Sequence, residues 1–187
     1  MYIKVKEAEL NVTDVTKYLD QHNIEYSLVA GEPSEACSDV ARCRNIKLSE
    51  VGKCLVYKRK KESWHSLLII IIIPGNRFFS EKKFESEFKY SIKMAPMEKI
   101  KKKFPNITKG TLSPPLFSNM QQCKFFYDES LLDEKKIDIS SGNPTFGCQL
   151  SKKSFLKLVE KLKMKPCNIT GKEIFYPGEH PLKKLLN

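Results

Sequence analysis

The chain has 187 residues, enough for one domain with a substantial core, so no second domain is needed. Its 33 lysines and arginines outnumber 22 aspartates and glutamates, giving a formal net charge of +11. Such a surface attracts nucleic acid or an anionic membrane, although a merely soluble, lysine-rich protein has the same composition. The six cysteines form no Cys-x-x-Cys pair and have no histidine at ligand spacing, which argues against a zinc site or disulfide framework and predicts reduced thiols.

The sequence shows no sign of secretion or of a membrane helix. Its N-terminus lacks the uninterrupted apolar stretch of a signal peptide. The longest apolar run, residues 67–73, is far shorter than the roughly 20 residues that a membrane helix needs. We therefore expect a cytoplasmic protein without membrane association.

The first predicted elements form a small helix–strand–helix lid. Asn11 or Thr13 can cap a helix that runs to about His22. Alternating apolar residues then predict a strand over 24–29, and a Gly-Pro turn separates it from a second helix over 34–44.

Two strands form the centre of the predicted sheet. The first covers 51–57 and ends in a basic turn over 58–61, and the second is the apolar run 67–73. Because that run has polar residues on neither face, it should lie in the middle of the sheet, covered on both sides. Lys53, near the start of the first strand, either projects into a cleft as a compact cation for phosphate or is a solvated lysine at a strand end.

A basic helix follows this centre, after a turn, a short helix over 81–87 and a strand over 92–94. Pro96 can begin a helix that runs through Lys103 with its apolar residues inward. Its lysines are either the solvated face of that helix or a contact surface for RNA phosphates. The helix leads directly into the segment 109–115.

The segment 109–115, Lys-Gly-Thr-Leu-Ser-Pro-Pro, predicts a stiff loop with exposed amides. Gly110 can take a positive φ and let another molecule approach the main chain, whereas Pro114 and Pro115 have a fixed φ and no N–H. On its own the pattern also describes an ordinary surface turn.

Two further strands are predicted over 123–128 and 137–142, joined by a turn over 129–136. The second ends in the small residues Ser140, Ser141 and Gly142, which leave room beside it. Ser151 then caps a helix with one apolar stripe. From 166 onward the chain is aperiodic and turn-rich, which predicts a tail or linker over 166–187 behind a domain over 1–165.

The usual motifs of nucleophilic catalysis and nucleotide binding are missing. No histidine lies in a recognisable Ser/His/Asp or Cys/His arrangement, and the chain has neither a Walker loop nor a Gly-x-Gly-x-x-Gly run. What remains, in chain order, is a strand lysine, a Gly-x-x-x-Pro loop, a Tyr-Asp strand end and a Ser-Ser-Gly strand end.

This ordered set resembles the YbaK and prolyl-tRNA-synthetase-associated deacylase family, which removes mischarged amino acids from tRNA. Segments 51–55, 110–114, 126–131 and 139–142 are similar to its lysine strand, its Gly-x-x-x-Pro loop, its Tyr-x-Asp strand end and its closing segment. The resemblance covers roughly 13–160. It implies a single α/β domain with a mixed, partly barrel-like central sheet flanked by helices.

The resemblance also implies roles for individual residues. Lys53 would hold the terminal phosphate and ribose of charged tRNA, and the amide of Gly110 would hold the aminoacyl carbonyl. No protein nucleophile, metal or cofactor is expected, because the terminal hydroxyl of the tRNA helps to activate water. The implied catalytic residues are Lys53, Gly110, Ser140 and Ser141; the implied substrate-binding residues are Tyr26, Leu28, Cys54, Thr111, Ser113, Pro114 and Gly142; the implied tRNA-binding residues are Lys99, Lys101, Lys102, Lys103 and Lys109.

Two departures from the family pattern bear on specificity. Members that remove alanine usually carry a histidine after the closing segment, and residues 143–148 contain none; Cys54 stands where the family often has Thr or Asn. The expected substrate is a prolyl tRNA carrying alanine or cysteine, with prolyl-tRNA synthetase as a partner in cis or in trans. The alternative is a catalytically silent tRNA-binding or assembly module attached to a prolyl-tRNA synthetase or a synthetase complex.

Overall fold

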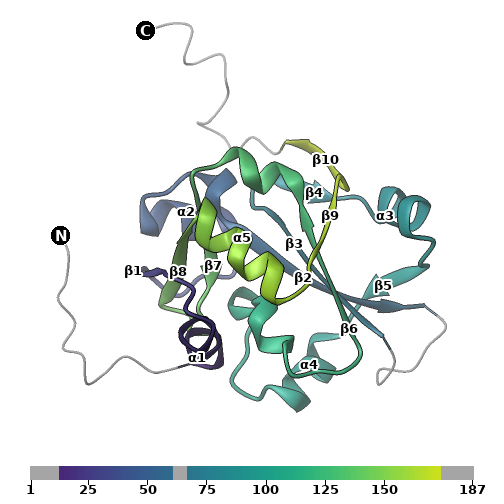
Figure 1. Cartoon of the computed structure of the whole chain (residues 1–187), viewed down its shortest axis with the longest axis horizontal. Coiled ribbons are helices and arrows are strands. Elements are labelled where there is room, and N and C mark those ends of the chain that lie inside the picture. The colour runs from purple at the N-terminus through teal and green to yellow at the C-terminus, as the bar shows by residue number, and fades with distance from the viewer. Residues whose placement is uncertain (1–12, 61–66, 174–187) are drawn as a thin grey trace, which may run out of the picture.

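The computed structural model describes residues 13–60 and 67–173 (Figure 1). The helices are α1 (Asp14–Gln21), α2 (Cys37–Arg44), α3 (Glu81–Phe88), α4 (Met97–Lys103) and α5 (Lys152–Lys161), with the short 3-10 helices η2 (Leu48–Glu50), η3 (Lys109–Thr111), η4 (Pro114–Phe117) and η5 (Glu129–Asp133). The strands are β1 (Ser27–Ala30), β2 (Gly52–Arg59), β3 (Leu68–Pro74), β4 (Arg77–Phe79), β5 (Ile92–Met94), β6 (Cys123–Asp128), β7 (Lys136–Ser140), β8 (Phe146–Ser151), β9 (Lys165–Cys167) and β10 (Thr170–Glu173).

Within the described ranges these strands form three sheets. The largest has the order β5-β2-β3-β6-β9, with β2 antiparallel to β3 and with β6 parallel to both β3 and β9. A three-stranded antiparallel sheet has the order β1-β8-β7, and β10 pairs with β4. A parallel bridge between Val51 and Asp138 brings the start of β2 beside β7, so the two larger sheets meet there. The predicted α/β fold with mixed sheets and flanking helices is confirmed.

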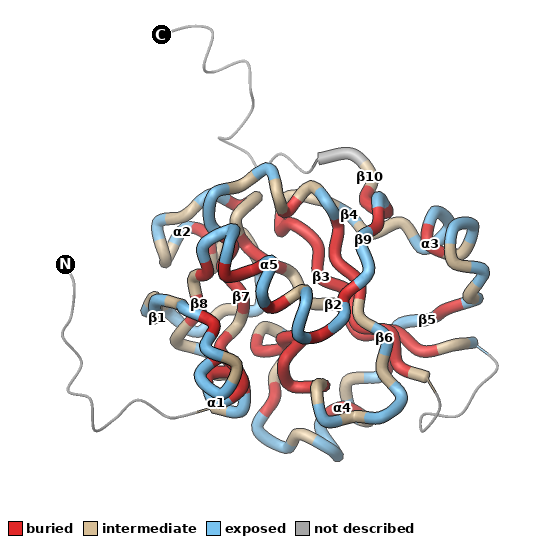
Figure 2. Tube along the Cα trace, in the orientation of Figure 1, coloured by how far each residue is buried: buried red, intermediate tan, exposed pale blue. Residues whose placement is uncertain are grey.

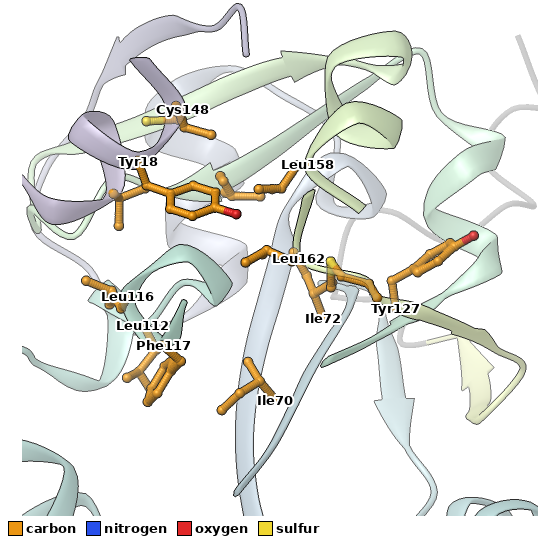
Figure 3. Close-up of a cluster of buried hydrophobic side chains, with 14 of the residues drawn as sticks. Tyr18, Ile70, Ile72, Leu112, Leu116, Phe117, Tyr127, Cys148, Leu158 and Leu162 are labelled. Atoms are coloured by element: carbon orange, nitrogen blue, oxygen red, sulfur yellow. The ribbon is translucent and has the colours of Figure 1, made fainter. Parts of the chain in front are cut away.

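β3 is buried along its whole length because apolar clusters cover both of its faces, as predicted (Figure 2). Ile70 and Ile72 point into one cluster, which Figure 3 shows together with Phe117 of η4. Ile69 and Ile71 point into the other, on the side of α3. Because β3 is buried on both faces, it gives the neighbouring strand β2, which pairs with it, a rigid support.

The helix starts follow the predicted caps. Thr13 caps α1 by accepting a hydrogen bond from the amide of Thr16, and Ser151 caps α5 in the same way. Asn11, the other predicted cap, lies outside the described residues. No helix in 13–60 or 67–173 is long and apolar enough to cross a membrane.

Some predicted boundaries are wrong. Residues 58 and 59 are not a turn: β2 continues through them because Lys58 pairs with both Leu68 and Lys93 on its two sides. Residue 61 of the predicted turn lies outside the described residues. β4 and β8 have no counterpart among the predicted strands.

The segment after Pro166 was predicted as a tail, and this is wrong for 166–173. β9 adds to β6 at the edge of the largest sheet, where a proline is tolerated because no donor is needed on its outer side. Asp128, at the end of β6, accepts hydrogen bonds from the amides of Ile169 and Thr170, each 3.1 Å long. Strands this short leave no recognisable period, which is why the sequence did not reveal them. The remainder, 174–187, lies outside the described residues.

Candidate functional site

A cavity of about 710 Å³ lies along β2, between α2, α4 and β7. Five of the residues selected from the sequence line it together: Lys53, Cys54, Lys109, Gly110 and Ser140. They come from three segments that lie far apart along the chain. The volume suits a small ligand, and most of the remaining lining is apolar.

Lys53 presents a partly desolvated ammonium to this cavity. It lies opposite Ile73 of β3, and its Nζ donates a 2.7 Å hydrogen bond to the carbonyl of Arg77. Burial lowers the pKa of Lys53, and the nearby Cys37 opposes that effect. Since an ammonium has three donors, two remain for an anionic or hydroxylic ligand.

The outer edge of β2 has unpaired main-chain groups beside Lys53. The carbonyl of Val51 accepts from Gly75 on the β3 side, whereas that of Val56 accepts from Ala95 on the opposite side. Because strand geometry has a period of two, the N–H and C=O of Cys54 also point away from β3. Since β5 pairs only with residues 57–59, these two groups have no partner in the described part of the chain. The cavity wall thus offers a main-chain donor and acceptor.

Gly110 is needed for close packing and not for a positive φ, which it does not have. A Cβ there would lie 3.1 Å from the Cα of Glu35 and closer still to the carbonyl oxygen of Ser34. The segment 109–115 is therefore not an exposed loop but the 3-10 helices η3 and η4, packed against the segment before α2. Glu35 lines the same cavity, so this contact shapes its wall.

The other predicted residues of this segment are structural. Thr111 is buried, and its hydroxyl accepts from the amide of Thr108 at 2.8 Å and donates to the carbonyl of the same residue. Ser113 and Pro114 are also buried and do not line the cavity.

Tyr26 and Leu28 were predicted to bound the site, but they line a separate open depression. Leu28 pairs with Cys148, whose side chain is buried in the cluster of Figure 3. Cross-strand neighbours share a face of the sheet, so Leu28 points to the core and away from Ser140. The sequence showed that apolar and polar residues alternate, but not which face of the strand points to the core.

Among the small residues that end β7, only Ser140 lines the cavity. Ser141 is buried, and its Oγ donates a 2.8 Å hydrogen bond to the carbonyl of Phe146. Gly142 has a φ of 85°, which favours glycine, and it forms the turn into β8. The alternation along β7 explains why neighbouring serines have different surroundings.

The predicted tRNA-binding lysines lie beside the cavity. Ile100 and Met97 of α4 line it, whereas Lys101, Lys102 and Lys103 of the same helix are exposed. Lys99 is half-buried, and among the five only Lys109 lines the cavity itself. A basic surface therefore adjoins the cavity, as an RNA backbone would require.

The same cavity is also lined by a buried ion pair between Arg44 and Asp138, which was not among the residues predicted from the sequence. Nη1 of Arg44 lies 2.5 Å from Oδ2 of Asp138, with the two side chains 7% and 1% exposed. Burial raises the pKa of Asp138, and the Arg44 guanidinium opposes that rise. A sequence signal was present: Asp138 interrupts the isoleucines of β7 at a position that shares a face with Ser140. No group of three or more potential metal ligands occurs among residues 13–60 and 67–173.

Replacing Gly110 with alanine should lower the free energy of unfolding by about 1–3 kcal/mol, because the new methyl group meets backbone that cannot rotate away. Urea titration of the purified protein measures this change. The matched control is Gly171→Ala in β10, where a Cβ would be 3.8 Å from its nearest neighbour, the carbonyl oxygen of Phe78. Equal stability of the two variants would contradict the packing role of Gly110.

Comparison with known proteins adds two findings. The family model described as "Aminoacyl-tRNA editing domain" matches residues 31–158, and no curated protein matches the chain. The fold is similar to that of the hypothetical protein APE2540, with a TM-score of 0.71, 15% identity, and coverage of 85% of this chain and 100% of that one.

Two other solved structures share the fold. A candidate trans-editing enzyme for prolyl-tRNA synthetase gives a TM-score of 0.66 at 14% identity, covering 85% of this chain and 96% of that one. A candidate signal transduction protein from Marinobacter aquaeolei VT8 gives a TM-score of 0.61 at 10% identity, and the match covers 85% of this chain and 30% of that one.

Proposed function

Since the chain belongs to the aminoacyl-tRNA editing domain family, we propose that it is a deacylase that hydrolyses the ester bond of a mischarged tRNA. The proposed substrate is a prolyl tRNA carrying alanine or cysteine, met in the cytoplasm with prolyl-tRNA synthetase as a partner in cis or in trans. The observation that carries the proposal is the single cavity in which Lys53, Gly110 and Ser140 meet.

The cavity offers binding groups suited to the end of a charged tRNA. The ammonium of Lys53 binds the terminal phosphate and ribose, and the exposed lysines of α4 lie along the path of the RNA backbone. The ester carbonyl accepts a hydrogen bond from a main-chain amide. Gly110 and Cys54 both supply amides without a partner in the described chain.

The proposed reaction uses positioning and not a protein nucleophile. Water attacks the ester carbonyl with help from the terminal hydroxyl of the tRNA, and the developing oxyanion is stabilised by the main-chain donors. The products are the free amino acid and the uncharged tRNA. The thiol of Cys54 takes no part as a thiolate, because burial raises its pKa far above neutrality.

The deciding experiment mixes an excess of the purified full chain with prolyl tRNA charged with alanine, cysteine or proline. We expect at least one mischarged ester to be hydrolysed faster than the prolyl ester and faster than its spontaneous decay. If both mischarged esters stay intact at enzyme excess, the proposal is wrong.

The rival function is a tRNA-binding module without catalysis. The absence of a histidine in 143–148 favours it, since family members that remove alanine usually carry one. Binding of tRNA that weakens steeply with salt, together with no deacylation, would establish this alternative. Failure to bind tRNA at low salt would contradict both functions.

A further inference from the structure

A second hollow, of about 670 Å³, lies between α1, the end of α4, η4 and the end of α5. The three α-helices lie near one another in Figure 1. Four lysines line this hollow: Lys17 of α1, Lys103 of α4, and Lys161 and Lys163 at the end of α5. Its lining includes one acidic residue, Asp14. We call it the basic hollow.

Three of these lysines have no acidic partner within residues 13–60 and 67–173. Nζ of Lys17 lies 3.8 Å from Oδ1 of Asp14, whereas Lys103, Lys161 and Lys163 are exposed and form no ion pair there. A lysine near a helix C-terminus interacts favourably with the helix dipole, which explains one cation at each helix end. It does not explain why three of them meet in one hollow. The excess of positive charge makes this a place that attracts an anion.

The floor of the basic hollow belongs to the packed core. Tyr18, Leu116 and Leu162 line the hollow and are members of the buried cluster of Figure 3. At the end of α5 the chain turns at Lys163, which has a φ of 51°, between the buried side chains of Leu162 and Met164. Both neighbours of Lys163 are therefore anchored, and its own side chain is left exposed on the surface.

The basic hollow and the cavity along β2 are neighbours on α4. Ile100 lines the cavity and Lys103 lines the hollow. Three residues of a helix rise by about 4.5 Å, a distance that a short stretch of RNA spans. Lys101 and Lys102, which are exposed, come between them in the chain. An RNA strand whose 3′ end lies in the cavity can therefore continue over α4 into the basic hollow.

We propose that the basic hollow binds the double-helical arm of the tRNA next to its single-stranded 3′ end, which rests on the proposed function because that function puts the 3′ end in the cavity. Proteins contact double-helical RNA mostly through its phosphates and 2′-hydroxyl groups. The lysines supply cations for the phosphates. Gln21, Ser118 and Asn119 also line the hollow and supply hydrogen-bonding groups for the hydroxyls. The cavity holds the reacting ester, and the hollow holds the body of the RNA.

The test measures how salt weakens the binding of an uncharged RNA hairpin that carries the double-helical arm and the 3′ end. Lys161→Ala combined with Lys163→Ala should weaken binding and make the slope of log association constant against log salt concentration shallower by about 2. Each lost phosphate contact accounts for about 0.9 of that slope. Fluorescence anisotropy of the labelled hairpin at several salt concentrations gives the slope.

The matched control is Lys152→Ala combined with Lys153→Ala, at the other end of the same helix. These lysines are exposed and do not line the basic hollow, so the control removes the same charge and should keep the wild-type slope. A second control is a single-stranded RNA that has the 3′ end but lacks the arm. It should bind the wild type and the Lys161 and Lys163 double variant equally, which a folding defect in that variant would not allow.

The outcomes separate this proposal from the function on which it rests. If the wild type deacylates mischarged tRNA and the Lys161 and Lys163 double variant keeps the wild-type slope, the basic hollow does not bind the arm and the deacylase function stands. If the double variant lowers the slope but the wild type deacylates nothing, the hollow is an RNA site and the deacylase function is wrong. Failure of the wild type to bind the hairpin at low salt would contradict both.

Discussion

Replacing Lys53 with alanine should reduce kcat/KM for the mischarged tRNA by about 10- to 100-fold, the range expected for loss of a hydrogen bond to a charged group. The ammonium has two free donors in the cavity, and alanine supplies none. Because Lys53 is proposed to hold the phosphate and ribose, most of the loss should be a rise in KM. Steady-state kinetics on alanyl and cysteinyl prolyl-tRNA measure both constants.

Lys82→Ala, on the exposed side of α3 and outside the cavity, removes the same charge and is the matched control. It should alter kcat/KM only slightly at moderate salt, since one distant surface charge is well screened. Equal values of kcat/KM for the Lys53 and Lys82 variants would show that Lys53 does not bind the substrate.

Replacing Asp128 with alanine should lower the free energy of unfolding by about 3 kcal/mol, because the buried amides of Ile169 and Thr170 lose their acceptor. Asp128 is itself 1% exposed, so water does not readily take its place. Chemical denaturation of the purified chain gives the value.

Asp133→Ala, at the exposed end of the neighbouring helix η5, is the control for this change. It should shift stability by no more than about 0.5 kcal/mol. If Asp128→Ala lowered the free energy of unfolding as little as Asp133→Ala, strand pairing and not Asp128 would hold the segment 169–170 in place.

Elements with a strong local signal could be predicted from the sequence. The run 67–73 had apolar residues on both faces and became the buried strand β3. Thr13 and Ser151 were recognisable as caps because their hydroxyls can satisfy amides only three residues away. Lys53, Gly110 and Ser140 were chosen by motif order, and they do line one cavity. Cys54, which follows the motif lysine, and Lys109, chosen as a tRNA-binding lysine, line it too.

What the sequence left open depended on contacts between distant residues. Leu28 belongs to an alternating strand, but only its pairing with Cys148 shows that it faces the core. The reason for Gly110 is the backbone at Ser34, which no local pattern reveals. The partnership of Arg44 and Asp138 joins residues that lie 94 positions apart.

The strands β9 and β10 have a consequence for how the protein folds during synthesis. They add to sheets whose other strands are made much earlier, so a chain leaving the ribosome N-terminus first cannot complete those sheets until residue 173 has emerged. Until residue 167 has emerged, the edge of β6 that β9 will cover is open and can pair with another nascent chain. Every described residue of the cavity is made before that moment. A nascent chain that has left the ribosome only as far as the end of α5 would therefore display a complete set of site residues on an unfinished, aggregation-prone sheet.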